Sequence, residues 1–249
     1  MTLSEQQSAV QTPHAHPLVV EIDPSVRARN LSRAFSEASA LEVLDVAINQ
    51  EFHGQIALVS SFGAESAVLL HLVAQVAPDT PVLFIDTQKH FAQTPFYRRK
   101  LAKELGLTNV QDIFPDDVEV ANDDPDGTLW QSSPDACCTI RKVRPLNTAL
   151  EEYGAWITGR KQFQGGDRVS LPVFEHKNDH YKVNPIVSWT PDDIQAYFHA
   201  HDLPPHPLVQ QGFPSIGCWP CTHPVAPGDD VRAGRWRGQA KTECGIHRA

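Results

Sequence analysis

The sequence predicts an α/β fold, with a mainly parallel, doubly wound sheet covered by helices on both faces. Short apolar runs of strand length alternate with amphipathic segments of helical period, which is the pattern of repeated βαβ units. The chain has 249 residues, of which 41% are hydrophobic and 20% are charged, so it can bury one sizeable core. No internal repeat and no linker divides that core.

Residues 1–30 are polar, contain prolines and lack periodicity, so we expect them to be disordered. Residues 31–230 are expected to form a single α/β domain, and residues 231–249 a mobile C-terminal tail. The acidic, turn-rich segment 116–136 is predicted to be mostly loop. We expect helices at 31–52, 94–107, 137–153 and 189–202, strands at 81–87, 109–114 and 155–161, and a strand, a turn and a helix within 56–76.

The net charge of −9 argues against a general nucleic-acid binder, because phosphate contacts need a basic surface. No apolar run is long enough to span a bilayer and no signal-peptide pattern is present, so we expect a cytoplasmic protein without a membrane partner. The oligomeric state stays open, and a homo-oligomer is compatible with the sequence. One dense group of cations near the C-terminus favours a small anionic ligand: Arg232, Arg235, Arg237 and Lys241.

The first predicted strand runs into Ser60–Ser66 (SSFGAES), which leads directly into a helix. Small residues let the backbone approach a ligand, and a helix N-terminus presents unpaired N–H groups to an anion. Three serine hydroxyls add donors. The segment lacks the G-x-x-x-x-G-K-[ST] pattern of a P-loop. Taken alone, it is equally compatible with an ordinary connection in an α/β fold.

Two further strand ends are expected near this turn, because ligands of doubly wound sheets bind beyond the carboxyl ends of the strands. The second strand ends in Asp86 and Thr87. The fourth leads into a loop that contains Gly159, Arg160 and Arg168. Together the three strand ends predict a pocket for a nucleotide-like anion. Each arginine alone is also compatible with a solvated surface charge.

The five cysteines divide into an adjacent pair (Cys137, Cys138), a C-x-x-C pair (Cys218, Cys221) and Cys244 alone. An isolated adjacent pair is more typical of buried structural thiols, but the second pair changes that interpretation. Adjacent helical side chains diverge, which suits a large centre better than a single small ion. The two pairs therefore favour a four-iron cluster, with zinc as the alternative.

Lys142 follows Cys138 by four residues on the same helical face. Its charge can offset that of a thiolate-ligated cluster or contact an anion in the adjoining pocket, although a solvated lysine fits the same spacing. Cys244 lies close in sequence to the cations Lys241 and His247. Neighbouring cations favour the nucleophilic thiolate, so Cys244 is a candidate for covalent catalysis from a mobile tail.

Several of these segments occur in the same order in a known family. The chain resembles the assimilatory adenylyl-sulfate (APS) reductases of the PAPS reductase family, and its cysteine pairs are similar to the iron–sulfur branch rather than the cluster-free PAPS reductases. It departs from the family at Asp86-Thr87-Gln88, where DTG is frequent, and in the loop QFQGGDR. The matching segments are SSFGAES, IDTQKHF, CCTIRK, ITGRKQ, NPIVSWT, GFPSIGCWPCT, RAGRW and KTECGIH, within residues 55–247.

The resemblance implies an adenine nucleotide alpha-hydrolase-like fold and roles for individual residues. It implies that Cys244 is the nucleophile and that Cys137, Cys138, Cys218 and Cys221 hold one 4Fe-4S cluster. The substrate-binding residues that it implies are Ser60, Ser61, Phe62, Gly63, Ala64, Glu65, Ser66, Asp86, Thr87, Lys142, Gly159, Arg160, Arg168, Arg232 and Arg235.

The same resemblance implies reduction of APS to sulfite and AMP in sulfate assimilation. The Cys244 thiolate would attack the sulfate sulfur, and thioredoxin, or glutaredoxin, would resolve the resulting Cys-S-sulfonate. In this scheme the cluster has a structural and electrostatic role, with Lys142 between it and the substrate. The nearest alternative is reduction of PAPS, alone or beside APS, because the two substrates differ by one phosphate.

Two alternatives of other classes account for parts of the sequence. An RNA-thiolating enzyme can combine a nucleotide turn with clustered cysteines, but it should have a turn richer in Gly and Lys and a basic RNA-binding surface. A zinc-stabilised nucleotide-binding module without catalysis would be colourless and would tolerate the loss of Cys244. The turn SSFGAES and the net charge of −9 argue against the RNA-thiolating enzyme.

Overall fold

A six-stranded sheet forms the centre of the molecule in this computed structural model, which describes residues 22–238, 241 and 243–248. Neighbouring strands are parallel except for the last two, so the predicted α/β class is confirmed. In spatial order the strands are β3 (Val110–Ile113), β2 (Val82–Ile85), β1 (Ile56–Val59), β4 (Ala155–Ile157), β6 (His180–Val183) and β5 (Phe174–Lys177).

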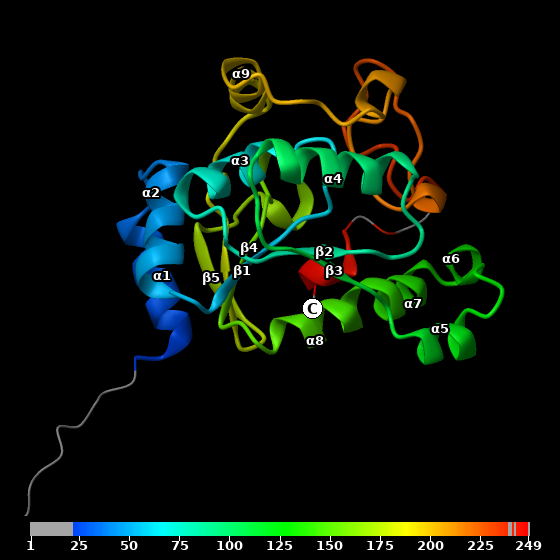
Figure 1. Cartoon of the computed structure of the whole chain (residues 1–249), viewed down its shortest axis with the longest axis horizontal. Coiled ribbons are helices and arrows are strands. Elements are labelled where there is room, and N and C mark those ends of the chain that lie inside the picture. Colours follow the sequence, from blue (N-terminus) through cyan, green and yellow to red (C-terminus); the bar gives the residue numbers. More distant parts are fainter. Residues whose placement is uncertain (1–21, 239–240, 242, 249) are drawn as a thin grey trace, which may run out of the picture.

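Helices cover both faces of this sheet (Figure 1). One face carries α2 (Ala40–Asp45), α3 (Ser66–Val76), α4 (Gln93–Glu104) and α9 (Pro191–Ala200), and α1 (Pro24–Ala34) packs beside β5. The other face carries α8 (Arg144–Leu150) and the tail helix α10 (Gly245–Arg248). Between β3 and α8 the chain forms three short helices, α5 (Asp117–Asp123), α6 (Leu129–Ser132) and α7 (Pro134–Cys138). Two further segments are π-helical, Val46–Glu51 and Thr139–Val143.

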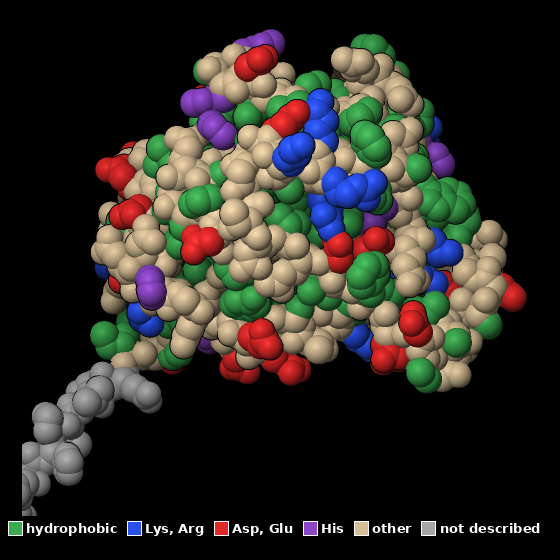
Figure 2. All heavy atoms as spheres, viewed as in Figure 1, with side chains coloured by type: hydrophobic (Ala, Val, Ile, Leu, Met, Phe, Trp, Pro, Cys, Tyr) green, Lys and Arg blue, Asp and Glu red, His purple; other side chains and the backbone are tan. Residues whose placement is uncertain are grey.

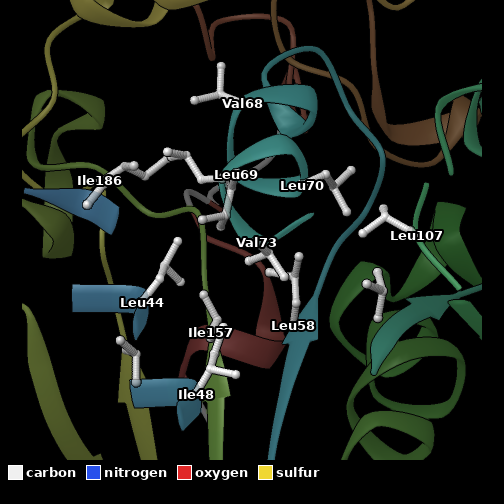
Figure 3. Packing of buried hydrophobic residues seen from close by; sticks show 14 of the residues in the cluster. Leu44, Ile48, Leu58, Val68, Leu69, Leu70, Val73, Leu107, Ile157 and Ile186 are labelled. Carbon is white, nitrogen blue, oxygen red and sulfur yellow. The ribbon is translucent and has the colours of Figure 1, made fainter. Parts of the chain in front are cut away.

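The central strands direct alternate side chains into two separate cores. Leu58 of β1 and Ile157 of β4 join the larger core beneath α2 and α3, where Figure 3 shows them close to Val73. Leu83 and Trp156 point the other way and join the smaller core with α8. Because both faces are covered, the strands are nearly continuous apolar runs, and this is why their positions are visible in the sequence.

The order of the strands places a switch point between β1 and β4. From β1 the chain proceeds through β2 to β3, then crosses back to β4 on the opposite side of β1, with Leu58 beside Ile157. In open α/β sheets, ligands bind outside the carboxyl ends of the strands at such a point. The fold therefore creates a binding crevice where the Ser60–Ser66 turn and the loop after β4 begin.

The first helix starts earlier than the sequence predicted. Asp23 caps α1 by accepting hydrogen bonds from the Ser25 and Val26 N–H groups, so residues 24–30 are helical and the expected disorder there is wrong. The rest of that expected segment, residues 1–21, lies outside the described residues. The single helix expected at 31–52 is divided, because Ser39 begins α2 with a capping box.

Two other expectations about the elements are corrected. The segment 116–136, expected to be mostly loop, contains α5, α6 and the start of α7, and Asp116 caps α5. The antiparallel β5–β6 pair was not predicted. Its turn residues Asn178 and Asp179 have φ of 51° and 61°, the conformation of a two-residue hairpin turn. A hairpin was therefore detectable from FEHK-ND-HYKV.

Figure 2 shows a local group of basic side chains over α4, where Arg99, Lys100 and Lys103 are exposed. Acidic side chains are spread more widely over this face and include those near α5 and α8. None of the helices in the described part of the chain is long and apolar enough to cross a bilayer.

Candidate functional site

A cavity of about 230 Å³ opens at the switch point, beyond the carboxyl ends of β1 and β4. Its wall combines the turn after β1, the loop after β4, the segment 214–217 and the C-terminal tail. The structure thus brings together residues that are almost 190 positions apart in the sequence. The predicted site residues in this wall are Ser60, Ser61, Gly63, Ala64, Glu65, Ser66, Thr87, Lys142, Gly159, Arg160, Arg168, Arg232, Arg235 and Cys244.

Two predicted substrate-binding residues, Phe62 and Asp86, have side chains outside the cavity wall. Phe62 is fully buried and packs edge-on against Phe84 in the larger core. Its φ of 46° turns the backbone so that this side chain points inward while its neighbours line the cavity. The Asp86 carboxylate accepts a hydrogen bond from the Gln88 N–H instead. The side chains of Phe62 and Asp86, which the sequence placed among the substrate-binding groups, therefore do not line the cavity.

Gly63 lets the turn after β1 pack closely against the segment that contains Ile216. A Cβ at Gly63 would lie 3.3 Å from Ser61 Oγ and 3.4 Å from the Ile216 carbonyl oxygen, so only glycine fits there without displacement. No side chain caps α3, because the Glu65 carboxylate instead pairs with Lys161 Nζ at 2.8 Å. The positive end of the α3 dipole is therefore left at the cavity.

Arg160, at the end of β4, is buried and held by its neighbours. Its guanidinium forms an ion pair with Glu175 and donates to Thr158 Oγ1 at 3.1 Å and Asn184 Oδ1 at 3.1 Å. These partners belong to β4, β5 and the end of β6. The orientation of Arg160 is thus fixed by the sheet itself.

Arg168 is held by a carboxylate from the tail, Glu243. The two side chains form a bidentate pair, with Nε–Oε2 at 2.6 Å and Nη2–Oε1 at 2.8 Å. Burial alone would raise the pKa of Glu243, but the Arg168 guanidinium outweighs it and holds that pKa at about 2. Glu243 was missed by the sequence reasoning, because only the fold brings it next to Arg168.

Three cations of the C-terminal tail lie over the ring of Trp236. Trp236 is 3% exposed, and Arg235 lies over its ring at 4.5 Å, with Lys241 at 5.6 Å and Arg232 at 5.8 Å. A Cβ at Gly217 would lie 2.4 Å from Arg235 Nη2, so that glycine makes room for the guanidinium. Arg235 Nε is buried without a hydrogen-bond partner among the described residues.

The charges around Cys244 differ from those expected. Burial lowers the pKa of His247 well below its usual value, and Arg160 and Arg168 lower it further, so His247 is neutral rather than a cation. Its ring stacks on Trp156 at 6.0 Å. Lys142 supplies the positive charge instead: burial lowers its pKa, but the thiols of Cys218, Cys244 and Cys138 outweigh that effect and raise it.

The other four cysteines are buried, unpaired and close enough to influence one another. Burial and then the Cys138 thiol raise the pKa of Cys137 to about 11. Burial and then the Cys218 and Cys138 thiols raise the pKa of Cys221. Thr87 Oγ1 lies 3.3 Å from Cys218 Sγ. Across the part of the chain that the structure describes, no three His, Cys, Asp or Glu side chains are placed to hold a metal ion.

The family model described as the phosphoadenosine phosphosulfate reductase domain matches residues 55–224. The chain belongs to this family. The match includes the sheet, the turn after β1 and both cysteine pairs, and it ends before the tail. The family expected from the sequence motifs is therefore confirmed.

Relatives of this PAPS reductase family member cover nearly the whole chain. Proteins named adenosine 5'-phosphosulfate reductase are similar to it in Mesorhizobium japonicum (48% identity, 90% of this chain and 88% of the relative) and in Mycolicibacterium smegmatis (36% identity, 90% and 98%). The solved phosphate complex of phosphoadenylyl-sulfate reductase from Candida auris has a TM-score of 0.68 at 27% identity, over 82% of this chain and 99% of that one. Candida glabrata FMN adenylyltransferase (TM-score 0.53, 16% identity, 80% and 74%) shares only the fold.

A buried ion pair supports the cysteine-bearing segment of this family member. Arg141 donates to Asp124 Oδ2 through Nε at 3.0 Å and Nη2 at 2.8 Å, and both side chains are almost fully buried. Arg141 Nη1 also donates to the Thr87 carbonyl oxygen at 3.2 Å. The pair therefore ties the end of α5 and the end of β2 to the π-helical segment that directly follows Cys138.

Proposed function

We propose that the protein reduces adenosine 5'-phosphosulfate to sulfite and AMP. The observation that carries this proposal is the position of Cys244, in the wall of the cavity with Lys142, Arg168, Arg232 and Arg235. A thiol among cations suits attack on an anionic sulfuryl group better than it suits simple binding. The names of the relatives support the same reaction.

In the first step, the Cys244 thiolate attacks the sulfur of the sulfate group. The bond between Sγ and that sulfur forms while the bond from sulfur to the bridging phosphate oxygen breaks, which gives Cys-S-sulfonate and AMP. Negative charge grows on the departing phosphate, and Arg232, Arg235 and Lys142 are the groups proposed to neutralise it. The turn after β1 and the α3 N-terminus are proposed to bind the nucleotide phosphate.

In the second step, a thiolate of thioredoxin, or of glutaredoxin, attacks the Cys244 sulfur. Sulfite leaves with the electron pair of the S–S bond, and a mixed disulfide forms. The second thiol of the reductant then releases Cys244, so the dithiol supplies both electrons. The tail has to present Cys244 to the cavity in the first step and to another protein in the second.

We also propose that Cys137, Cys138, Cys218 and Cys221 hold one 4Fe-4S cluster. Four buried thiols that influence one another suit a thiolate-ligated centre whose ligands are spread over a cube. When bound, the cluster would supply a structural anchor and negative charge opposite Lys142. Chemical analysis of anaerobically purified protein is expected to find iron and sulfide in equal amounts. Zinc in their place would refute the cluster.

Intact-protein mass spectrometry tests the reaction directly. Anaerobically purified wild type and Cys244→Ser are mixed with APS without any thiol reductant. A gain of one SO3 group is expected on the wild type alone, and reduced thioredoxin should reverse it. An equal adduct on both proteins would show that Cys244 is not the nucleophile. Adduct formation from PAPS but not from APS would shift the proposal to PAPS reduction, the alternative named by the structural neighbour.

A further inference from the structure

The Glu243 carboxylate lies where an anionic substrate group would be expected. It is bidentate with Arg168, and its Oε1 also lies 3.5 Å from Arg232 Nη2. Both arginines belong to the cavity wall, as does Glu243 itself. The same Oε1 accepts the N–H of Cys244 at 2.7 Å. One carboxylate therefore links two cavity arginines to the backbone of the proposed nucleophile.

Among the residues that the structure describes, Glu65 and Glu175 also pair with cavity cations, and Glu243 differs from both in the part of the chain that carries it. Glu65 pairs with Lys161 from the start of α3, and Glu175 pairs with Arg160 from β5, so both are carried by the domain. Glu243 is carried by the tail, one residue before Cys244. Release of the Arg168–Glu243 pair would therefore change the position of Cys244, whereas release of the other two would not.

We propose that Glu243 is an internal anion that occupies the arginine site of the empty enzyme and is displaced by the phosphosulfate group of the substrate. The buried Arg168 guanidinium would be costly without a counter-charge, and Glu243 removes that cost while the cavity is empty. A bound substrate supplies its own negative charge to Arg168 and Arg232. It then frees Glu243, and with it the Cys244 N–H.

Displacement has two consequences for the proposed reaction, on which this inference rests. The substrate must break the contacts of Glu243 with the arginines before it can bind them. The observed binding free energy is therefore less favourable by the free energy of those contacts. In return, the nucleophile is anchored at the cavity when no substrate is present. Glu243 is thus a positioning residue that couples occupancy of the arginine site to the placement of Cys244.

Binding of ADP tests this inference, because ADP carries a phosphate in place of the sulfate and transfers no sulfuryl group to Cys244. Calorimetric titrations compare wild type, Glu243→Gln and the control Asp135→Asn. Asp135 pairs with Lys241, so the control removes a different ion pair of the tail and leaves Arg168 and Arg232 untouched. We expect Glu243→Gln to bind ADP about tenfold more tightly than wild type, because a neutral amide competes poorly for two guanidinium groups. The control should bind ADP like wild type.

A second readout follows the anchor itself. Without ligand, alkylation of Cys244 by iodoacetamide, located by peptide mass spectrometry, should be faster in Glu243→Gln than in wild type. Thermal unfolding checks that each variant is folded, and Glu243→Ala replaces the glutamine variant if that one is not. Equal or weaker ADP binding by the folded variant, or an equal gain in Asp135→Asn, would overturn the inference. That result would leave the proposed function standing if APS still transfers SO3 to Cys244 of the wild type.

Discussion

Single residues in this protein have their chemistry set by contacts that the chain makes far from them in sequence. His247, three positions after Cys244, is neutral because burial, Arg160 and Arg168 lower its pKa. Glu243 is strongly acidic because Arg168 faces it. The same reasoning applies outside the site, at His206.

His206 is fully buried and must be neutral to make its two hydrogen bonds. Its Nδ1 accepts the Leu208 N–H at 3.2 Å, so Nε2 carries the proton and donates to Thr94 Oγ1 at 3.2 Å. Burial lowers the pKa of His206 from 6.5 to about 4. The unfolded chain therefore binds the proton more readily than the folded one between these two values.

The stability contributed by neutral His206 is complete above pH 6.5 and is lost as the pH falls toward 4. At about 1.4 kcal/mol for each pKa unit, we expect a loss of about 3 kcal/mol in the free energy of unfolding across this range. Urea unfolding of wild type and His206→Gln at several pH values measures it. The free energy of unfolding of His206→Gln should fall less than that of wild type between pH 6.5 and pH 4. An equal fall in both proteins would contradict the proposed role of neutral His206.

At the scale of elements, the site depends on how the segment from α5 to α8 is held together. This segment contains the four short helices α5 to α8 and a π-helical turn, which have little stability of their own because short helices are marginal without packing. The buried Arg141–Asp124 pair joins its parts. If one partner is removed, the other remains as a buried charge without a counter-charge. The stability lost in this way is larger than the net stability that the ion pair contributes.

We therefore expect Asp124→Ala to lower the free energy of unfolding by about 3–5 kcal/mol. The exposed Asp126, two residues away, provides the matched control, and Asp126→Ala should change stability by less than about 0.5 kcal/mol. Urea unfolding compares the two variants with wild type. The Asp124 variant should also retain less iron after purification, because Cys137 and Cys138 lie just before Arg141. Equal stability of the two variants would show that the pair is not needed.

At the scale of the whole molecule, one sheet connects two cores. Ile157 belongs to the larger core and Leu146 of α8 to the smaller one, and both are almost fully buried. The same strands β1, β2 and β4 supply residues to each core, so neither core can lose its packing without disturbing the other. We therefore expect residues 31–230 to unfold as a single cooperative unit.

Two cavity-forming variants test this cooperativity. Ile157→Ala and Leu146→Ala should each lower the free energy of unfolding by about 2–5 kcal/mol and shift the same single transition. Val118→Ala is the control, because that side chain is 68% exposed. Thermal unfolding followed by circular dichroism and by tryptophan fluorescence should give coincident curves. Two separate transitions, each sensitive to one variant, would show that the cores unfold independently.

The fold class, the positions of the central strands and the division of the cysteines could all be predicted from local patterns in the chain. These features depend on local patterns: buried parallel strands are continuous apolar runs, and the start of α9 is marked by Thr190, Pro191 and Asp193. The early start of α1 and the short helices after β3 were missed, because polar segments of this kind become helical through local caps and tertiary support.

The assembly of the candidate site depends on contacts between distant parts of the folded chain. Which strand ends meet depends on the sheet order β3-β2-β1-β4-β6-β5, and nothing local in the sequence encodes that order. It brings Glu243 to Arg168 across 75 positions, buries Phe62 instead of exposing it to the cavity, and makes His247 neutral. Residue types can be inferred from a motif, but their charges and partners follow from burial and proximity, which exist only in the folded chain.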